Sequence, residues 1–158
     1  MVGQSTVTAA FAAKDALQDA IKAALTAKNE TEVDITFGFR WPMINKSWIS
    51  LLSGESDISW AGLGARAQDE VIRLEVHFGA WSPVIPGNDD EYDVQDRAFE
   101  LVDIVTAYIR STDLTLGGTV KTCLPSKIAW DGATTDDESG QSRVCVVAVE
   151  FTCTHRIR

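Results

Sequence analysis

The sequence is poor in the residue types from which most catalytic and metal sites are built. It contains only two histidines and three cysteines in 158 residues. His77 and His155 belong to no His-Glu-x-x-His motif or other ligand spacing, so surface positions are the ordinary interpretation. Cys145 and Cys153 are eight residues apart on one predicted strand, too far at about 3.3 Å per residue to bind one metal ion. We therefore expect no catalytic residues, no metal, no cofactor and no enzyme activity.

Basic residues are also scarce. Lys and Arg number 14 against 23 Asp and Glu, which gives a formal net charge of −9. Nucleic-acid affinity comes mainly from neutralising phosphates, so a surface specialised for binding DNA or RNA is not expected. No apolar run approaches the roughly 20 residues of a membrane span, and no signal peptide opens the chain. Three cysteines without a Cys-x-x-Cys motif fit buried free thiols in a protein made in a reducing cytoplasm.

The glycine clusters predict turns, and the tryptophans are the unusual feature. Gly62-Leu63-Gly64 and Gly117-Gly118 lack the spacing of a phosphate-binding loop. Tryptophan is enriched in protein cores and at the centres of interfaces, so we expect some of each here. The five are Trp41, Trp48, Trp60, Trp81 and Trp130.

Residues 93–111 predict the central helix of the fold. Their apolar residues recur at helical spacing, and acidic residues crowd the start of the helix, where its dipole favours them. Asp93 with Asp96 is a plausible N-cap arrangement, and Gly117-Gly118 turns the chain afterwards. The buried stripe comprises Val94, Ala98, Leu101, Val102, Val105, Tyr108 and Ile109.

The remaining chain predicts one more helix and a set of strands. Residues 6–26 read as an Ala-rich helix capped by Ser5 or Thr6. In the clearest strand, residues 70–78, apolar and polar side chains alternate, as they do in a sheet with one buried face. The other predicted strands are residues 33–39, 47–52, 57–61, 120–130 and 143–157.

Two loops complete this prediction. Residues 79–91 contain two prolines and lead into the central helix. Residues 131–142 join the arms of the last hairpin and are acidic, rich in small residues and without an aliphatic anchor. We expect this tip to be mobile in the free subunit and ordered against a basic surface in an assembly. The fold class is thus α+β: a mainly antiparallel sheet, two helices on one face and a protruding C-terminal hairpin, as a single domain of residues 1–158.

This order of elements resembles the tail terminator (tail-completion) proteins of long-tailed bacteriophages. The resemblance rests on four pieces that span nearly the whole chain. They are the Ala-rich opening helix, the 70–78 strand after Leu63-Gly64-Ala65-Arg66, the acidic-start helix ending in residues 113–120, and the 143–158 strand with its Thr154-His155-Arg156-Ile157 ending. The Leu-Gly-Gly turn and this ending are the residue-level matches; the remainder is a pattern of elements.

The resemblance implies a structural virion protein at the head–tail junction, made in the host cytoplasm. Such subunits form a ring, six-membered in that family, that caps the tail tube and joins it to a head connector or stopper protein. DNA would pass through an acidic lumen without sequence-specific binding. Heterologous contacts that close a ring need two different patches on each subunit. The candidate assembly residues are Trp41, Trp60, Trp81, Arg66, Asp136, Asp137 and Glu138.

Two other functions compete with this one. The nearest alternative in the same class is another head–tail connector or tail-tube subunit. A small enzyme or ligand-binding α+β domain, with an apolar pocket lined by tryptophans, is the alternative from a different class.

Overall fold

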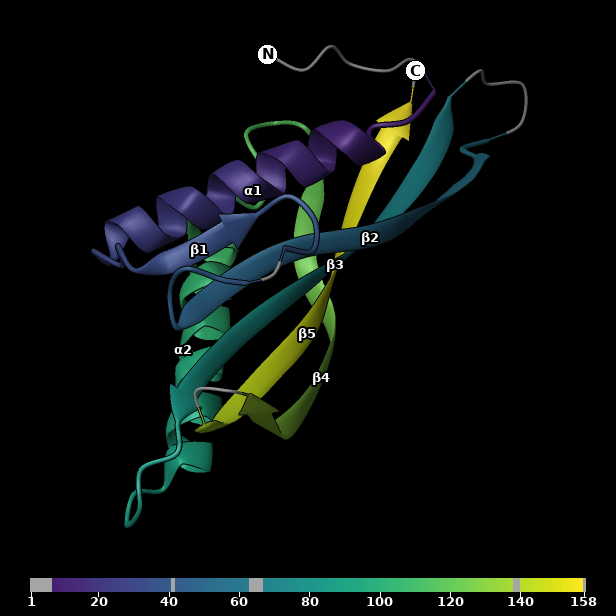
Figure 1. Cartoon of the computed structure of the whole chain (residues 1–158). Coiled ribbons are helices and arrows are strands. Elements are labelled where there is room, and N and C mark those ends of the chain that lie inside the picture. Colours follow the sequence, from purple (N-terminus) through teal and green to yellow (C-terminus); the bar gives the residue numbers. More distant parts are fainter. Residues whose placement is uncertain (1–6, 41, 63–66, 138–139, 158) are drawn as a thin grey trace.

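The computed structural model describes residues 7–40, 42–62, 67–137 and 140–157, with the side chains of residues 133–141 left aside. Two helices pack on one five-stranded sheet in the strand order β1-β2-β3-β5-β4, which confirms the predicted α+β class (Figure 1). The helices are α1 (Ala10–Ala27) and α2 (Asp90–Ser111). The strands are β1 (Val33–Thr36), β2 (Ser47–Trp60), β3 (Gln68–Pro83), β4 (Thr122–Asp137) and β5 (Gly140–Ile157).

The sheet is mainly antiparallel, as predicted. Strands β2, β3, β5 and β4 each pair antiparallel with their neighbour, while the short β1 pairs parallel with β2. The central pair, β3 with β5, runs without interruption from Gln68 opposite Ile157 to Pro83 opposite Ser142. Strands β1 and β4 form the two edges of the sheet.

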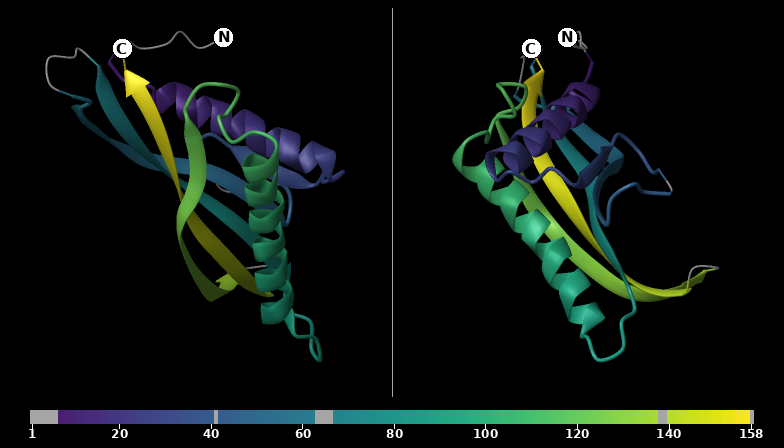
Figure 2. Two further views of the ribbon diagram at one scale, coloured as in Figure 1. Left: turned by 180° about the vertical axis from the view of Figure 1, so that it is seen from behind. Right: turned by 60° about the vertical axis from the view of Figure 1, so that its left-hand side comes forward.

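The core lies between one face of this sheet and both helices (Figure 2). Ile72, Leu74, Val76 and Phe78 of β3 all point into it, as the alternation in the sequence predicted. The predicted common face of β5, Cys145, Val147, Val149, Phe151 and Cys153, is also fully buried. Helix α2 contributes Val94, Ala98, Leu101, Val102, Val105 and Ile109. The two helices therefore cover a single face, which we call the helix face.

Strand β2 replaces two shorter predicted strands. The polar residues 53–56 suggested a turn, but the strand continues through them with a register shift between Leu51 and Gly54. Gly54 fits this bulge because a Cβ atom there would lie 2.8 Å from the carbonyl oxygen of Arg73. A bulge lets the strand absorb an irregular stretch and continue, so the prediction of a turn was wrong.

The last hairpin is longer than predicted. Residues 131–142 were expected to form a loop, but β4 runs to Asp137, β5 begins at Gly140, and Asp137 pairs with Gly140. Because each strand supplies the other with a hydrogen-bonding partner, pairing overrides the weak strand propensity of small and acidic residues. Strand β3 likewise continues to Pro83, through the first part of the predicted 79–91 loop.

Strand β1 is shorter than the predicted strand 33–39. It ends at Thr36, and Gly38 then adopts a φ of 129°. The Asp34 side chain holds the connection to β2, since its carboxylate accepts the backbone N–H groups of Ile44 (2.6 Å) and Asn45 (2.9 Å). The edge of the sheet on this side is thus one short strand followed by an anchored loop.

Both helices begin elsewhere than predicted. Helix α1 starts at Ala10 with Ala9 as N-cap, and the predicted caps, Ser5 and Thr6, lie outside the described residues. Helix α2 starts three residues earlier than predicted, because Asp89 accepts the N–H of Tyr92 at 3.2 Å and takes the capping role expected of Asp93. The predicted turn after α2 is confirmed, with Leu116, Gly117 and Gly118 all at positive φ.

Candidate assembly surfaces

The structure describes four of the seven predicted assembly residues. Trp41, Arg66 and Glu138 lie outside the described residues. Asp136 and Asp137 lie in β4, opposite Gln141 and Gly140 of β5. Trp60 is 71% exposed and pairs with Gln68, whereas Trp81 is half-buried beside the opposite end of the β2–β3 pair. Trp60 and Trp81 therefore belong to different surfaces.

The β4 edge carries an exposed aromatic group, Trp130, that was not among the candidate assembly residues. Trp130 lies opposite the buried Val147, so it points to the helix face, yet 59% of it is exposed. Its ring packs edge-to-face on Phe99 of α2, with centroids 5.5 Å apart. Ile128, two residues before it on the same face, is also exposed. The β4 edge thus has a half-covered apolar strip, which we call the β4 patch: Phe99, Ile128 and Trp130.

The β1 edge carries a second aromatic group. Phe37, just after β1, is 40% exposed and packs edge-to-face on Phe11 of α1 with centroids 5.8 Å apart. Phe11 itself is 59% exposed. The ammonium group of Lys14 lies 4.3 Å from the centre of the Phe37 ring, a cation–π geometry. We call Phe11 and Phe37 the β1 patch; with the β4 patch it makes two apolar areas at opposite edges of one sheet.

The β4 edge is protected from further pairing along only part of its length. Strand β4 carries Pro125, and the register shifts between Pro125 and Lys127, where the Ser126 hydroxyl donates to the carbonyl of Glu150 at 3.1 Å. Proline and a bulge are devices that protect an edge from further pairing. Beyond Lys127 the ladder with β5 is regular again, and it includes Ile128 and Trp130.

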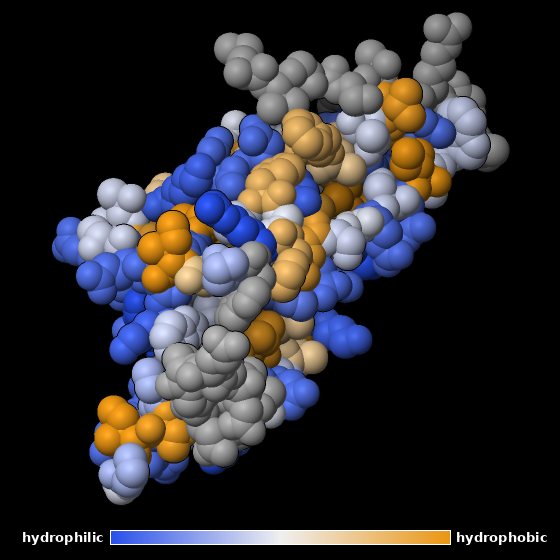
Figure 3. All heavy atoms as spheres, in the orientation of Figure 1, coloured by the Kyte–Doolittle hydropathy of each residue, from blue (hydrophilic) through white to orange (hydrophobic). Residues whose placement is uncertain are grey.

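Trp48 and Trp81 both make contacts within the subunit. Trp48 is buried and lies over Gly79, its cross-strand neighbour, so closely that a Cβ atom there would come within 2.1 Å of the indole. Lys46 lies 5.9 Å from the Trp81 ring centre, and the backbone N–H of Trp81 donates to the Lys46 carbonyl. The space-filling view shows apolar patches separated by hydrophilic atoms (Figure 3).

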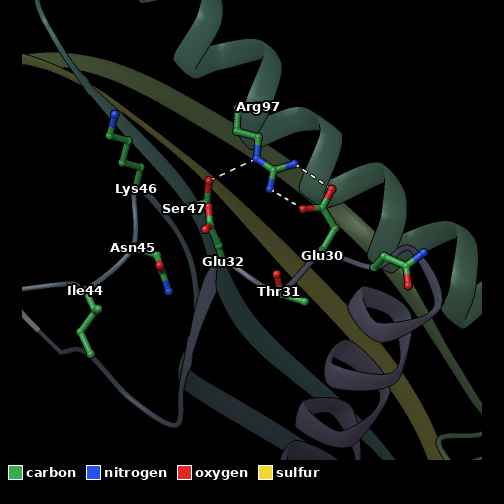
Figure 4. Close-up of a pocket in the computed structure, with 9 residues that line it drawn as sticks. Glu30, Thr31, Glu32, Ile44, Asn45, Lys46, Ser47 and Arg97 are labelled. Carbon is green, nitrogen blue, oxygen red and sulfur yellow. Dashed lines mark hydrogen bonds and ion pairs between the residues drawn. The ribbon is translucent and has the colours of Figure 1, made fainter.

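An open polar groove of about 570 Å³ lies among α2, β2 and the segment after α1. Arg97 of α2 lines this groove and makes a bidentate ion pair with Glu30, with Nη2 to Oε2 at 2.7 Å and Nη1 to Oε1 at 3.1 Å (Figure 4). The same guanidinium donates to Glu100 at 2.8 Å and to Ser47 at 3.2 Å. Its donors are therefore used inside the subunit, where they tie α2 to α1 and to β2.

Local backbone geometry positions Glu30 for this pair. Asn29 takes a left-handed conformation with φ of 56° after α1, and the N–H of Glu30 bonds back to the Leu25 carbonyl at 2.9 Å. The hydrogen bond from Arg97, together with its charge, outweighs partial burial and lowers the pKa of Glu30. The pKa of Arg97 is raised by the same partner, so the pair is ionised at neutral pH.

The groove differs from the pocket that a ligand-binding function predicted. Its lining is polar apart from Ile44, and no described tryptophan contributes to it. Among the described residues no group of three or more His, Cys, Asp or Glu side chains is placed to hold a metal ion. No helix within the described part of the chain is long and apolar enough to cross a membrane.

Comparison with known proteins finds distant similarity to solved structures. No protein-family model matches this chain, and no curated protein matches it. A chain from a solved structure of the virion of a native gene transfer agent particle is similar over 87% of this chain and 94% of its own length. The identity is 10% and the TM-score 0.32, a level of similarity that carries no argument about function.

Proposed function

We propose that this protein is a structural subunit of a phage-like virion that forms a ring, of six copies, at the head–tail junction. The ring caps the tail tube, docks on a head connector or stopper protein and lets DNA pass through an acidic lumen. The sequence resemblance suggests the role. The observation that carries it is the pair of open sheet edges, each with a different exposed aromatic patch, because a closed ring needs two distinct contact surfaces on each subunit.

The net negative charge and the hydrogen bonds of Arg97 within the subunit both fit this role. A net charge of −9 disfavours adhesion to DNA that moves past the protein. The Arg97 guanidinium lines the polar groove, but it is already bound to Glu30, Glu100 and Ser47. It therefore joins the two helices to the sheet.

Two measurements test the proposal. Native mass spectrometry of the purified protein, alone and with tail tubes, should show a ring of about six subunits. Deletion of the gene should yield separate heads and tails, and supplying the protein should restore joined particles. Complete particles made without the gene would remove the proposed role, whatever the oligomeric state of the purified chain.

A further inference from the structure

The two edge strands run in opposite directions. Strand β1 is parallel to β2, and the β2–β3, β3–β5 and β5–β4 pairs are each antiparallel, so β4 is antiparallel to β1. When identical subunits follow one another side by side, β4 of one copy meets β1 of the next with this relative direction. The helix faces of both copies then lie on the same side. Antiparallel edge strands can extend a sheet through their free backbone groups.

The exposed aromatic patches lie on matching sides of these edges. Trp130 and Ile128 point to the helix face of β4 beside α2, and Phe37 packs on Phe11 of α1 at the β1 edge. Side-by-side subunits would therefore bring the β4 patch of one copy to the β1 patch of its neighbour. Aromatic anchors of this kind supply much of the free energy of protein interfaces.

Two acidic groups adjoin the β4 patch and two basic groups adjoin the β1 patch, while Lys127 of β4 and Asp34 of β1 have the opposite signs. Glu91 of α2 lies over Gly132 of β4, and the exposed Asp131 follows Trp130 in β4, on the other face of the strand opposite Val146. Lys14 covers Phe37 in the β1 patch, and the exposed Arg40 follows a few residues later. None of these four charged groups takes part in an ion pair within the described residues.

This charge pattern separates two possible symmetries. A two-fold contact of β4 with β4 would set Glu91 and Asp131 of both copies against each other, and a contact of β1 with β1 would do the same with Lys14. A contact of β4 with β1 sets acids against bases and apolar groups against apolar groups. Direction, face and charge thus favour the head-to-tail contact.

We propose that a second copy of this chain binds at each edge, with β4 and α2 of one subunit against β1 and α1 of the next. This inference rests on the proposed function, because it names the contact through which the ring closes. The sheet becomes continuous from subunit to subunit, with Trp130 and Phe37 at the centre of each junction.

A pair of single-edge variants tests this contact. Trp130→Ser and Phe37→Ser each remove one patch, and neither residue belongs to the buried core. Each variant alone should lose the higher oligomers and be at least tenfold weaker in self-association. Mixed together, the two should form a new species of twice the 17.2 kDa subunit mass that contains one copy of each, since one intact β4 edge and one intact β1 edge remain. Ile85→Ser, at an exposed apolar residue of the loop before α2, is the matched control and should assemble as the unmodified chain does.

Each other outcome counts against the proposal. If only one of the two variants loses assembly, the contact is two-fold and the head-to-tail arrangement is wrong. If both assemble normally, or if the unmodified chain is monomeric both alone and on tail tubes, the edges are not contacts between copies. Circular dichroism and thermal melts of each variant show that loss of assembly is not loss of fold. If the variants show that the edges are not contacts, the proposed role in the virion is still open. If the variants form one-to-one dimers but particles assemble without the gene, the edge-to-edge contact is supported and the virion role is refuted.

Discussion

The Glu70 carboxylate of strand β3 accepts a hydrogen bond from the backbone N–H of Ala9 at 3.0 Å. A side chain of the sheet therefore caps the start of helix α1. Ser56 donates to the same carboxylate at 2.6 Å, and the Thr8 hydroxyl donates to it as well. Glu70 is almost completely buried, and its charge is set at the positive end of the α1 dipole. One acidic side chain therefore joins the start of the first helix to β2 and β3.

The first prediction is that Glu70→Ala lowers the free energy of unfolding by about 2–3 kcal/mol, because three donors lose a charged acceptor in a buried site. Glu70→Gln should cost less at neutral pH, since an amide oxygen still accepts one or two of these bonds. Urea unfolding measures both. Glu32→Gln, at an exposed position, is the control and should change stability by less than about 0.5 kcal/mol.

The same site predicts a pH dependence. Burial raises the pKa of Glu70, but the hydrogen bonds from Ser56, Thr8 and Ala9 together outweigh it, so the pKa lies below the ordinary value of a glutamate. The carboxylate therefore contributes stability above the pKa of the unfolded chain and loses it as pH falls through the folded pKa. The stability difference between the unmodified protein and Glu70→Gln should shrink on acidification. A difference that grows instead would mean that the folded protein prefers the neutral acid.

The third prediction concerns Arg97 and Glu30, which are both partly buried. In a double-mutant cycle, Arg97→Ala and Glu30→Ala should couple by about 1 kcal/mol, because the ion pair is bidentate and joins α2 to the end of α1. Arg110→Ala at the exposed end of α2 should show no coupling to Glu30→Ala. Additive effects of the first pair would show that the ion pair contributes nothing to stability.

The fourth prediction is that Gly79→Ala destabilises the fold by about 1–3 kcal/mol, because the new methyl group would collide with the Trp48 indole. Replacing the tryptophan by a smaller residue, in the double variant Gly79→Ala with Trp48→Leu, should recover part of the lost stability. Gly62→Ala is the matched control, since no atom lies within 4 Å of the added Cβ. Thermal melts of the four variants, including Trp48→Leu alone, decide whether the two sites are coupled.

The fifth prediction is that the three thiols are unreactive in the folded protein. The pKa of Cys123 is raised by its hydrogen bond with Cys153 and by burial, and burial raises the pKa of Cys145. Because the thiolate is the reactive form, thiol reagents should modify the protein only after unfolding. Replacing all three by Ala should cost about 1 kcal/mol at each site and leave assembly intact. Rapid modification of the native protein, or normal folding with lost assembly, would contradict this.

Helix α2, the turn at Gly117 and the buried faces of β3 and β5 were predictable because each follows from a local pattern in the sequence. The length of the last hairpin was not, since residues 131–137 become a strand through their pairing with β5. The cap from Glu70 also escaped prediction, because it joins residues 61 positions apart. Phe37 and Trp130 both lie in predicted strands, but their exposure depends on which strands occupy the edges. That order is a property of the whole sheet.

The order of the strands also sets when this protein can fold during its synthesis. Gln68 pairs with Ile157, a separation of 89 residues, and β4 pairs only with β5 in the described sheet. The first three strands and both helices therefore leave the ribosome before the strand that completes the centre of the sheet. Contacts of such long range form slowly. The β4 edge can therefore form only after β5 has been made and has paired with β3.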